Sequence, residues 1–192
     1  METSASLLER LRTTADEAAW RRLDDLYRPL LRRWLAHDPS LGDEADDIVQ
    51  EVMAVLLREL PGFQRGRTGS FRRWLRSITA HRLAAHYRYR KNRPRAIGGS
   101  PEEGPLAQLA DAHSELSRAW DEEHDRYVVR RLVELITPLF EPTTLAAFRR
   151  VALDGVAPAQ AAAELGISLN AVLLAKSRVL SQLRQEAVGL ID

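Results

Sequence analysis

Cysteine is absent from the 192-residue chain, which excludes structural disulfides, thiolate zinc sites, iron–sulfur clusters and a cysteine nucleophile. No apolar run approaches the roughly 20 residues that a membrane-spanning helix needs. The N-terminus, Met-Glu-Thr-Ser-Ala-Ser, lacks the basic start and the apolar stretch of a signal peptide. These absences predict a cytoplasmic protein without membrane insertion.

Catalytic motifs are absent as well. The sequence has no Walker loop, no HExxH and no GxSxG. His81 and His86 are five residues apart, whereas two metal ligands on one helix face are four apart. Asp46 and Asp47 are adjacent and would point in different directions on a helix. We therefore expect no enzyme, no catalytic residues, no metal and no cofactor.

Strand signals are scarce, because Val and Ile are scattered through windows rich in Ala, Leu, Arg and Glu. The predicted fold class is all-α, with two small helical domains and a helix-turn-helix in the second. The predicted boundaries are residues 1–93 for the first domain, 94–113 for the linker and 114–192 for the second domain. Six of the twelve residues from 94 to 105 are Pro or Gly, so the linker is expected to be flexible.

Three helices are predicted in the first domain. Apolar residues at spacings of three and four predict a helix over 16–36, in which Pro29 would cause a kink or a break. The second helix would begin with Asp43 as its N-cap and end at Pro61-Gly62. The third would run from Ser70 to about residue 92.

Charge is strongly segregated although the net charge is only +1. No acidic residue lies between Glu59 and Glu102, and residues 65–95 (the basic window) carry eleven positive charges. This density favours binding of a polyanion with release of counterions. Four aromatic residues in the same window could stack on unpaired bases. The alternative is a solvated arginine face over core residues, and we assign Trp74 and Ile78 to the core.

Residues 158–186 predict a helix, a tight turn and a second helix. Pro158 suits the first helical turn, Gly166 supplies a positive φ for the turn, and Ser168 is a good N-cap. The N-terminal part of the second helix in such a unit enters the major groove of DNA. The alternative is an ordinary helical hairpin, since from Thr144 to Glu186 there are only five basic residues against three acidic ones.

Several motifs carry a family resemblance. They are Asp46-Asp47-Ile48-Val49-Gln50-Glu51-Val52, Gly69-Ser70-Phe71-Arg72-Arg73-Trp74-Leu75, Ala162 with Glu164-Leu165-Gly166-Ile167-Ser168, and Ala175-Lys176-Ser177-Arg178-Val179-Leu180. With them the chain resembles the extracytoplasmic-function group of bacterial RNA polymerase sigma factors. The resemblance covers about residues 16–93 and 114–187.

The resemblance implies a sigma factor that directs RNA polymerase to promoters and assists promoter melting. Core RNA polymerase and promoter DNA would be its partners, and an anti-sigma factor is a further partner that this group often has. Polymerase binding would use an acidic helix with Asp46, Asp47, Gln50 and Glu51. The minus-ten element would be bound by Arg65, Arg67, Ser70, Arg72, Arg73, Arg76, Arg82 and Arg90. The minus-thirty-five element would be bound by Ser168, Asn170, Lys176, Ser177 and Arg178.

The chain departs from the family at two places. Leu174-Ala175 stands where the family often has a polar and basic pair, and Asn170 replaces a common glycine. These departures weaken base readout by the second domain but leave phosphate anchoring by Lys176 and Arg178 in place. Two other functions stay open: a dimeric helix-turn-helix regulator that binds duplex DNA unaided, and a polymerase-interaction protein that binds no DNA.

Overall fold

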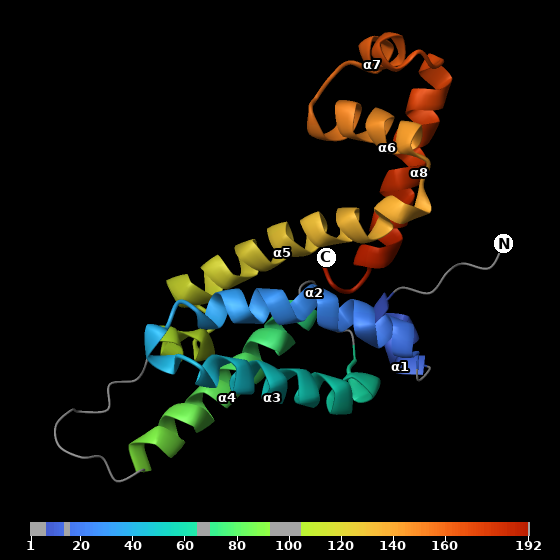
Figure 1. Ribbon diagram of the computed structural model, residues 1–192. Helices are drawn as coiled ribbons and strands as arrows, with labels where there is room; N and C mark the ends of the chain where they lie inside the picture. Colours follow the sequence, from blue (N-terminus) through green and yellow to red (C-terminus); the bar gives the residue numbers. More distant parts are fainter. Residues whose placement is uncertain (1–6, 14–15, 65–69, 93–104, 192) are drawn as a thin grey trace. The chain divides into compact units, whose positions relative to one another are not determined.

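A computed structural model describes residues 7–13, 16–64, 70–92 and 105–191. The helices are α1 (Leu7–Thr13), α2 (Glu17–Leu35), η1 (Pro39–Leu41), α3 (Glu44–Glu59), η2 (Leu60–Gly62), α4 (Ser70–Asn92), η3 (Pro105–Ala110), α5 (Glu115–Ile136), η4 (Thr137–Leu139), α6 (Pro142–Phe148), the π-helical η5 (Arg149–Leu153), α7 (Pro158–Leu165) and α8 (Leu169–Ala187) (Figure 1). The described residues form no β-sheet, which confirms the all-α prediction. None of the helices among them combines the length and apolar character needed to cross a membrane.

The chain divides into two compact units within α5. The first unit comprises Leu7–Val128 with the C-terminal residues from Gly189, and the second comprises Val129–Val188. The sequence placed the start of the second domain at residue 114, before this helix. The division lies later because the first half of α5 buries Trp120 and His124 in the first unit. Most of the predicted linker, residues 93–104, lies outside the described residues.

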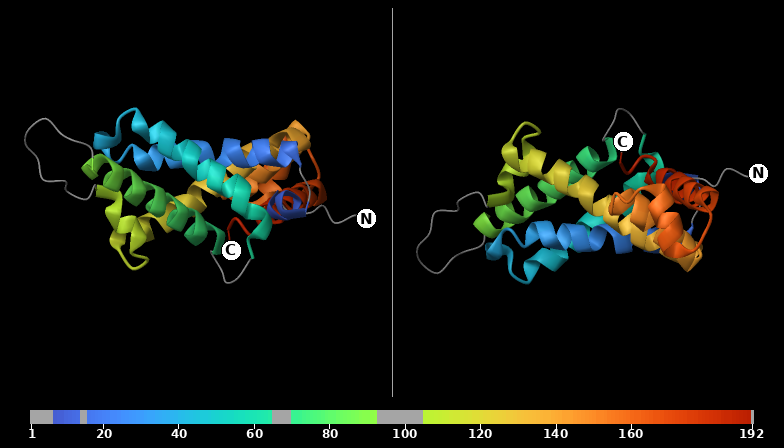
Figure 2. Two further views of the ribbon diagram at one scale, coloured as in Figure 1. Left: turned by 90° about the horizontal axis from the view of Figure 1, so that it is seen from below. Right: turned by 90° about the horizontal axis from the view of Figure 1, so that it is seen from above.

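The first unit is built around α2, α3 and α4, which pack against one another (Figure 2). Asp16 caps α2 by accepting a 2.9 Å hydrogen bond from the backbone N–H of Ala19. The helix then continues through Pro29 without the predicted break. Asp43 holds the predicted N-cap position of α3, but its φ of −67° and ψ of −21° are already helical, and its side chain makes no cap hydrogen bond. A capping side chain needs an extended backbone.

Aromatic side chains join α2 to α4 and α5. The rings of Tyr27 and Phe71 have centroids 5.4 Å apart, and those of Trp34 and Trp120 are 4.9 Å apart. Tyr27, Phe71 and Trp120 are fully buried. Because each aromatic ring buries a large apolar area, the contact of Trp34 with Trp120 fixes the first half of α5 to the first unit.

The second unit has a small core between α6, α7 and α8, whose central residues are Ala147, Ala161, Ala162, Val172 and Ala175. Gly166 closes the turn between α7 and α8 with a φ of +63°, a conformation that favours glycine. The Ser168 hydroxyl accepts a hydrogen bond of 3.1 Å from the backbone N–H of Ala171 and so caps α8. The predicted helix, turn and helix are therefore present at the predicted residues.

Candidate polymerase and nucleic-acid interfaces

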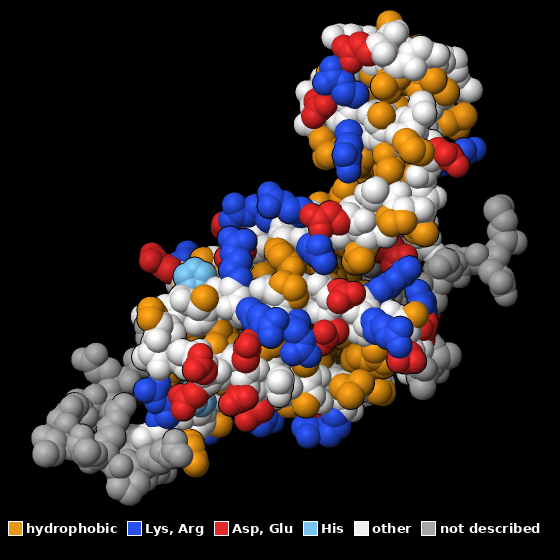
Figure 3. Space-filling model, in the orientation of Figure 1, with side chains coloured by type: hydrophobic (Ala, Val, Ile, Leu, Met, Phe, Trp, Pro, Cys, Tyr) orange, Lys and Arg blue, Asp and Glu red, His pale blue; other side chains and the backbone are white. Residues whose placement is uncertain are grey.

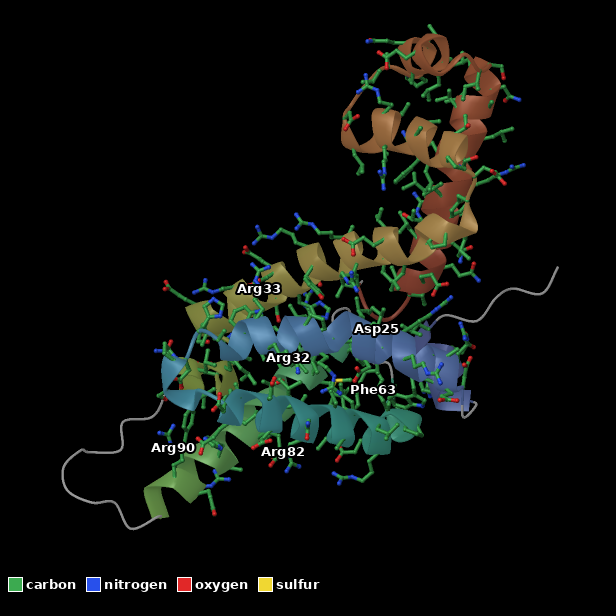
Figure 4. The ribbon with its side chains drawn as sticks, viewed as in Figure 1. Asp25, Arg32, Arg33, Phe63, Arg82 and Arg90 are labelled. Carbon is green, nitrogen blue, oxygen red and sulfur yellow. The ribbon has the colours of Figure 1, made fainter. Side chains whose placement is uncertain are left out.

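The acidic residues of α3 lie on its exposed side. Asp46, Asp47, Gln50 and Glu51 are all exposed, while Val49 and Val52, on the opposite side, are fully buried. Arg32 of α2 donates a 2.7 Å hydrogen bond to Asp46, and Arg82 of α4 lies 3.9 Å from Glu51 (Figure 4). Exposed ion pairs contribute about 0–1 kcal/mol, so a binding partner can replace them at little cost.

A groove of about 510 Å³ lies beside this acidic face, between α2 and α3. Its lining residues are Trp20, Arg21, Asp24, Asp25, Arg28, Gln50, Met53, Ala54 and Leu57. Leu57 is 55% exposed, and Arg28 pairs with Asp24 at 2.7 Å on the rim. An apolar floor with charged rims suits an amphipathic helix of a protein partner. Of the predicted polymerase-binding residues, Gln50 belongs to this groove.

The structure places Arg72 and Arg76 differently from the prediction. Arg76 is only 5% exposed, and its Nη1 donates to Asp121 Oδ1 at 2.6 Å and to the Ser117 carbonyl at 3.2 Å. Arg72 donates to Asp125, and its Nε lies 3.6 Å from Asp121. Both guanidinium groups therefore pair with the acidic first half of α5, where Arg76 is buried and the Arg72 side chain stays 20% exposed.

The pKa of the Asp125 carboxyl reflects its hydrogen bonds with His124 and Arg72. Burial alone would raise the pKa of the Asp125 carboxyl, but hydrogen bonds from His124 and Arg72 outweigh burial and lower that pKa. A third cation of the first unit, Arg33 of α2, pairs with Glu123 at 2.6 Å (Figure 4). The acidic stretch after the linker thus provides carboxylates to the arginines of the first unit.

The other arginines predicted to bind the minus-ten element are more accessible. Arg73 is exposed, and the Arg82 side chain is 38% exposed. Arg90 is half-buried and donates to the Ser40 carbonyl at 2.7 Å, so it also anchors the end of α4 (Figure 4). Arg65 and Arg67 lie outside the described residues. Ser70 begins α4, but its side chain lies outside the described part of the structure.

An aromatic pair lies at the two ends of the segment 65–69. Phe63 stacks on Trp74, with centroids 4.7 Å apart and planes at 25°, and meets Phe71 edge-on at 5.7 Å. Phe63 and Trp74 are half-buried, whereas Phe71 is fully buried. Trp74 was assigned to the core from sequence, and Phe63 was not singled out. Half-buried stacked rings beside a basic segment are suited to stacking on an unpaired base.

The candidate residues of the second unit lie between the N-cap and the middle of α8. Ser168 uses its hydroxyl to cap the helix. Asn170, Ser177 and Arg178 are exposed, and Lys176 is half-buried. Near them Arg150 donates to Glu164 at 2.7 Å, which joins η5 to α7. This hydrogen bond lowers the pKa of Glu164 and raises that of Arg150.

Comparison with known protein families finds a match within the first unit. Residues 23–93 match the family model described as Sigma-70 region 2. The match includes most of α2 and all of α3 and α4. This family consists of non-enzymatic transcription initiation factors that bind core RNA polymerase, in agreement with the prediction that the chain is not an enzyme. A search of curated proteins found no match.

Proposed function

We propose that this protein is a sigma factor of the extracytoplasmic-function group, which directs RNA polymerase to specific promoters and assists promoter melting. The observation that carries this proposal is the sigma-70 region 2 match over α2, α3 and α4, the helices that hold the acidic face, the groove and the basic window. In this proposal residues 1–93 act as sigma region 2 and residues 114–192 as sigma region 4. The role places the protein in the cytoplasm, with core polymerase and promoter DNA as partners.

Core polymerase binds, in this proposal, to the acidic face of α3 and the neighbouring groove. Asp47 and Gln50 are exposed, so cations and polar groups of a partner helix can reach them. Met53 and Leu57, one and two turns further along α3, offer apolar contacts in the groove. Asp46 gives up its exposed ion pair with Arg32 when it pairs with a polymerase cation. Glu51 likewise gives up its exposed ion pair with Arg82.

The minus-ten element binds along α4 and the segment before it. Arg73, Arg82 and Arg90 contact phosphates, and Arg65, Arg67 and Ser70 lie near a base extruded from the duplex. Phe63 and Trp74 offer an aromatic surface at both ends of that segment. Stacking contributes about 1–3 kcal/mol per base, which is comparable to the few kcal/mol needed to unstack and unpair a base. Arg72 and Arg76 are reassigned to the attachment of α5.

The minus-thirty-five element binds to the second unit, with α8 in the major groove. Lys176 and Arg178 border the exposed start of α8 and are placed to anchor phosphates. Ser168 positions the helix through its cap, and Asn170 and Ser177 face the bases. An anti-sigma factor remains a predicted partner, with no residue assigned to it.

In vitro transcription tests this function directly. Core polymerase that lacks its own sigma subunit is mixed with the protein and a genomic promoter library, and transcript starts are sequenced. We expect initiation at a defined set of sites only when the protein is present. A stand-alone regulator would instead bind specific duplexes tightly without polymerase. Absence of initiation at every site would refute the proposal.

A double substitution tests the docking face. Asp47→Arg with Gln50→Ala should abolish co-purification with core polymerase, because it places a cation and removes a polar contact beside the groove. Glu122→Arg is the matched control, since Glu122 is an exposed carboxylate on α5, 74% accessible. It should co-purify like the wild type. Unchanged co-purification of the double variant would exclude the docking role of α3.

A further inference from the structure

The outward face at the start of α8 is mainly apolar. Val172, Ala175 and Val179 point into the second unit and are buried. The opposite face begins with five residues, which are Leu169, Asn170, Leu173, Leu174 and Ser177, and it continues with exposed Arg178 and Ser181. The three leucines are 47%, 47% and 46% exposed. In the space-filling view the residues of α6–α8 show mainly hydrophobic and uncharged surface (Figure 3).

The chemistry of these five side chains restricts which bases they can recognise. Guanine offers two acceptors in the major groove, which Arg or Lys recognises, and neither residue type occurs from Leu169 to Ala175, the first two turns of α8. Adenine presents an acceptor and a donor that match the amide of Asn170. Thymine presents a methyl group, which favours contact with apolar side chains such as Leu173 and Leu174.

We infer that α8 selects A·T base pairs, with Asn170 hydrogen-bonded to an adenine and Leu173 and Leu174 packed on thymine methyl groups. This inference rests on the proposed function, because it assumes that the second unit binds duplex DNA. Leu169 extends the apolar contact at the N-terminal end of the helix. Lys176 and Arg178 hold the backbone and add no preference for a base.

Two observations favour duplex DNA over a protein partner for this face. Gly166 and the Ser168 cap produce the tight turn that presents the start of the second helix to a major groove. Polar Asn170 and Ser177 lie among the leucines, and exposed Arg178 borders them, so the patch combines apolar contact with hydrogen bonding and positive charge.

The first test selects the preferred sequence. The holoenzyme, formed from core polymerase and the full chain, is incubated with promoter duplexes whose upstream element is randomised, and bound duplexes are sequenced. We expect A·T pairs at the central positions, including one position whose preference for adenine is lost in Asn170→Ala. Enrichment of G·C pairs at these positions would overturn the inference.

The second test removes thymine methyl groups. Deoxyuridine replaces thymidine in the selected element, which deletes the methyl and keeps the base pairing. Wild-type holoenzyme should bind about fourfold more weakly for each contacted methyl, the value that burial of one carbon group implies. The double variant Leu173→Ala, Leu174→Ala should be insensitive to the replacement. Leu153→Ala, a control at a 61% exposed leucine of the same unit, should retain full sensitivity.

The outcomes of these tests distinguish a failure of the A·T inference from a failure of the proposed function. If the holoenzyme initiates normally but the wild type does not distinguish thymidine from deoxyuridine, the A·T inference fails and the proposed function stands. If the leucine variant instead loses core polymerase, the face docks a protein and the inference is wrong. If no promoter supports initiation, the proposed function and the inference fail together.

Discussion

The two units use charge in opposite ways. In the first unit, arginines of α2 and α4 are paired with carboxylates of α5, and Arg76 is almost completely buried in such a pair. In the second unit, the exposed start of α8 carries leucines where a DNA-reading helix often carries cations. On the face drawn in Figure 3, positive and negative side chains are interspersed over the first unit, and hydrophobic and uncharged surface predominates on α6–α8.

This contrast shows that charge density along a sequence differs from charge available to a ligand. The basic window contains eleven cations, but the structure assigns Arg72 and Arg76 to internal pairing. The second unit has only a small net charge, and in the proposed function its exposed α8 face discriminates bases. In the proposed function, the first unit would supply most of the electrostatic affinity and the second most of the base contacts outside the melted region.

The sharpest test of the contrast compares two arginines of α4. Asp121→Ala removes the partner of buried Arg76 and should cost about 3–5 kcal/mol of unfolding free energy, the typical cost of leaving a buried charge unpaired. Arg73→Ala, at an exposed position, should change stability by about 1 kcal/mol or less and weaken promoter binding by the holoenzyme. Urea denaturation measures the unfolding free energy of both variants, and filter binding measures how tightly their holoenzymes bind promoter DNA. Equal stabilities of the two variants would erase the distinction drawn between these arginines.

The pH dependence of stability tests the pairing of Asp125 with Arg72 and His124. The pKa of Asp125 is lower in the folded protein than in the unfolded chain, so its ionised form stabilises the fold above the unfolded pKa of about 4. This contribution is lost as the pH falls through the folded pKa. Asp125→Asn should therefore be less stable at pH 7 and lose less stability between neutral pH and pH 3 than the wild type. If the unfolding free energies of Asp125→Asn and of the wild type changed equally with pH, this result would contradict the assigned pairing of Asp125.

The smallest expected effect concerns the cations beside α8. Each phosphate contact contributes a slope of roughly −0.9 to the dependence of log affinity on log salt concentration. Lys176→Ala and Arg178→Ala should each reduce the slope for holoenzyme binding by about one contact and weaken all promoter sequences alike. An unchanged slope, or a loss confined to one base position, would show that these residues do not act as phosphate anchors.

Local patterns in the sequence predicted most of the helices. The periodicity of apolar residues located α2, and Pro158, Gly166 and Ser168 located the bounds of α7 and the start of α8. These features depend on residues within a few positions of one another, so their physical cause can be identified in the sequence.

Long-range partners could not be predicted in this way. Arg72 and Arg76 pair with carboxylates 45 to 53 residues away, across the segment rich in Pro and Gly. Asp121 and Asp125 belong to an acidic stretch of the sequence, but nothing local shows which cations this stretch meets. The stacking of Phe63 on Trp74 likewise depends on how the chain returns after residues 65–69. Burial and pairing of this kind require the three-dimensional arrangement.

The weak contact between Glu51 and Arg82 has a thermodynamic consequence. The Glu51 carboxylate of α3 lies 3.9 Å from the Arg82 guanidinium of α4. In the proposed function, a polymerase cation that takes Glu51 releases Arg82 to a phosphate. The enzyme and the DNA then enhance each other's binding by the same factor, because such coupling is reciprocal. A pair of exposed side chains would thus make the free protein a poorer DNA ligand than the holoenzyme.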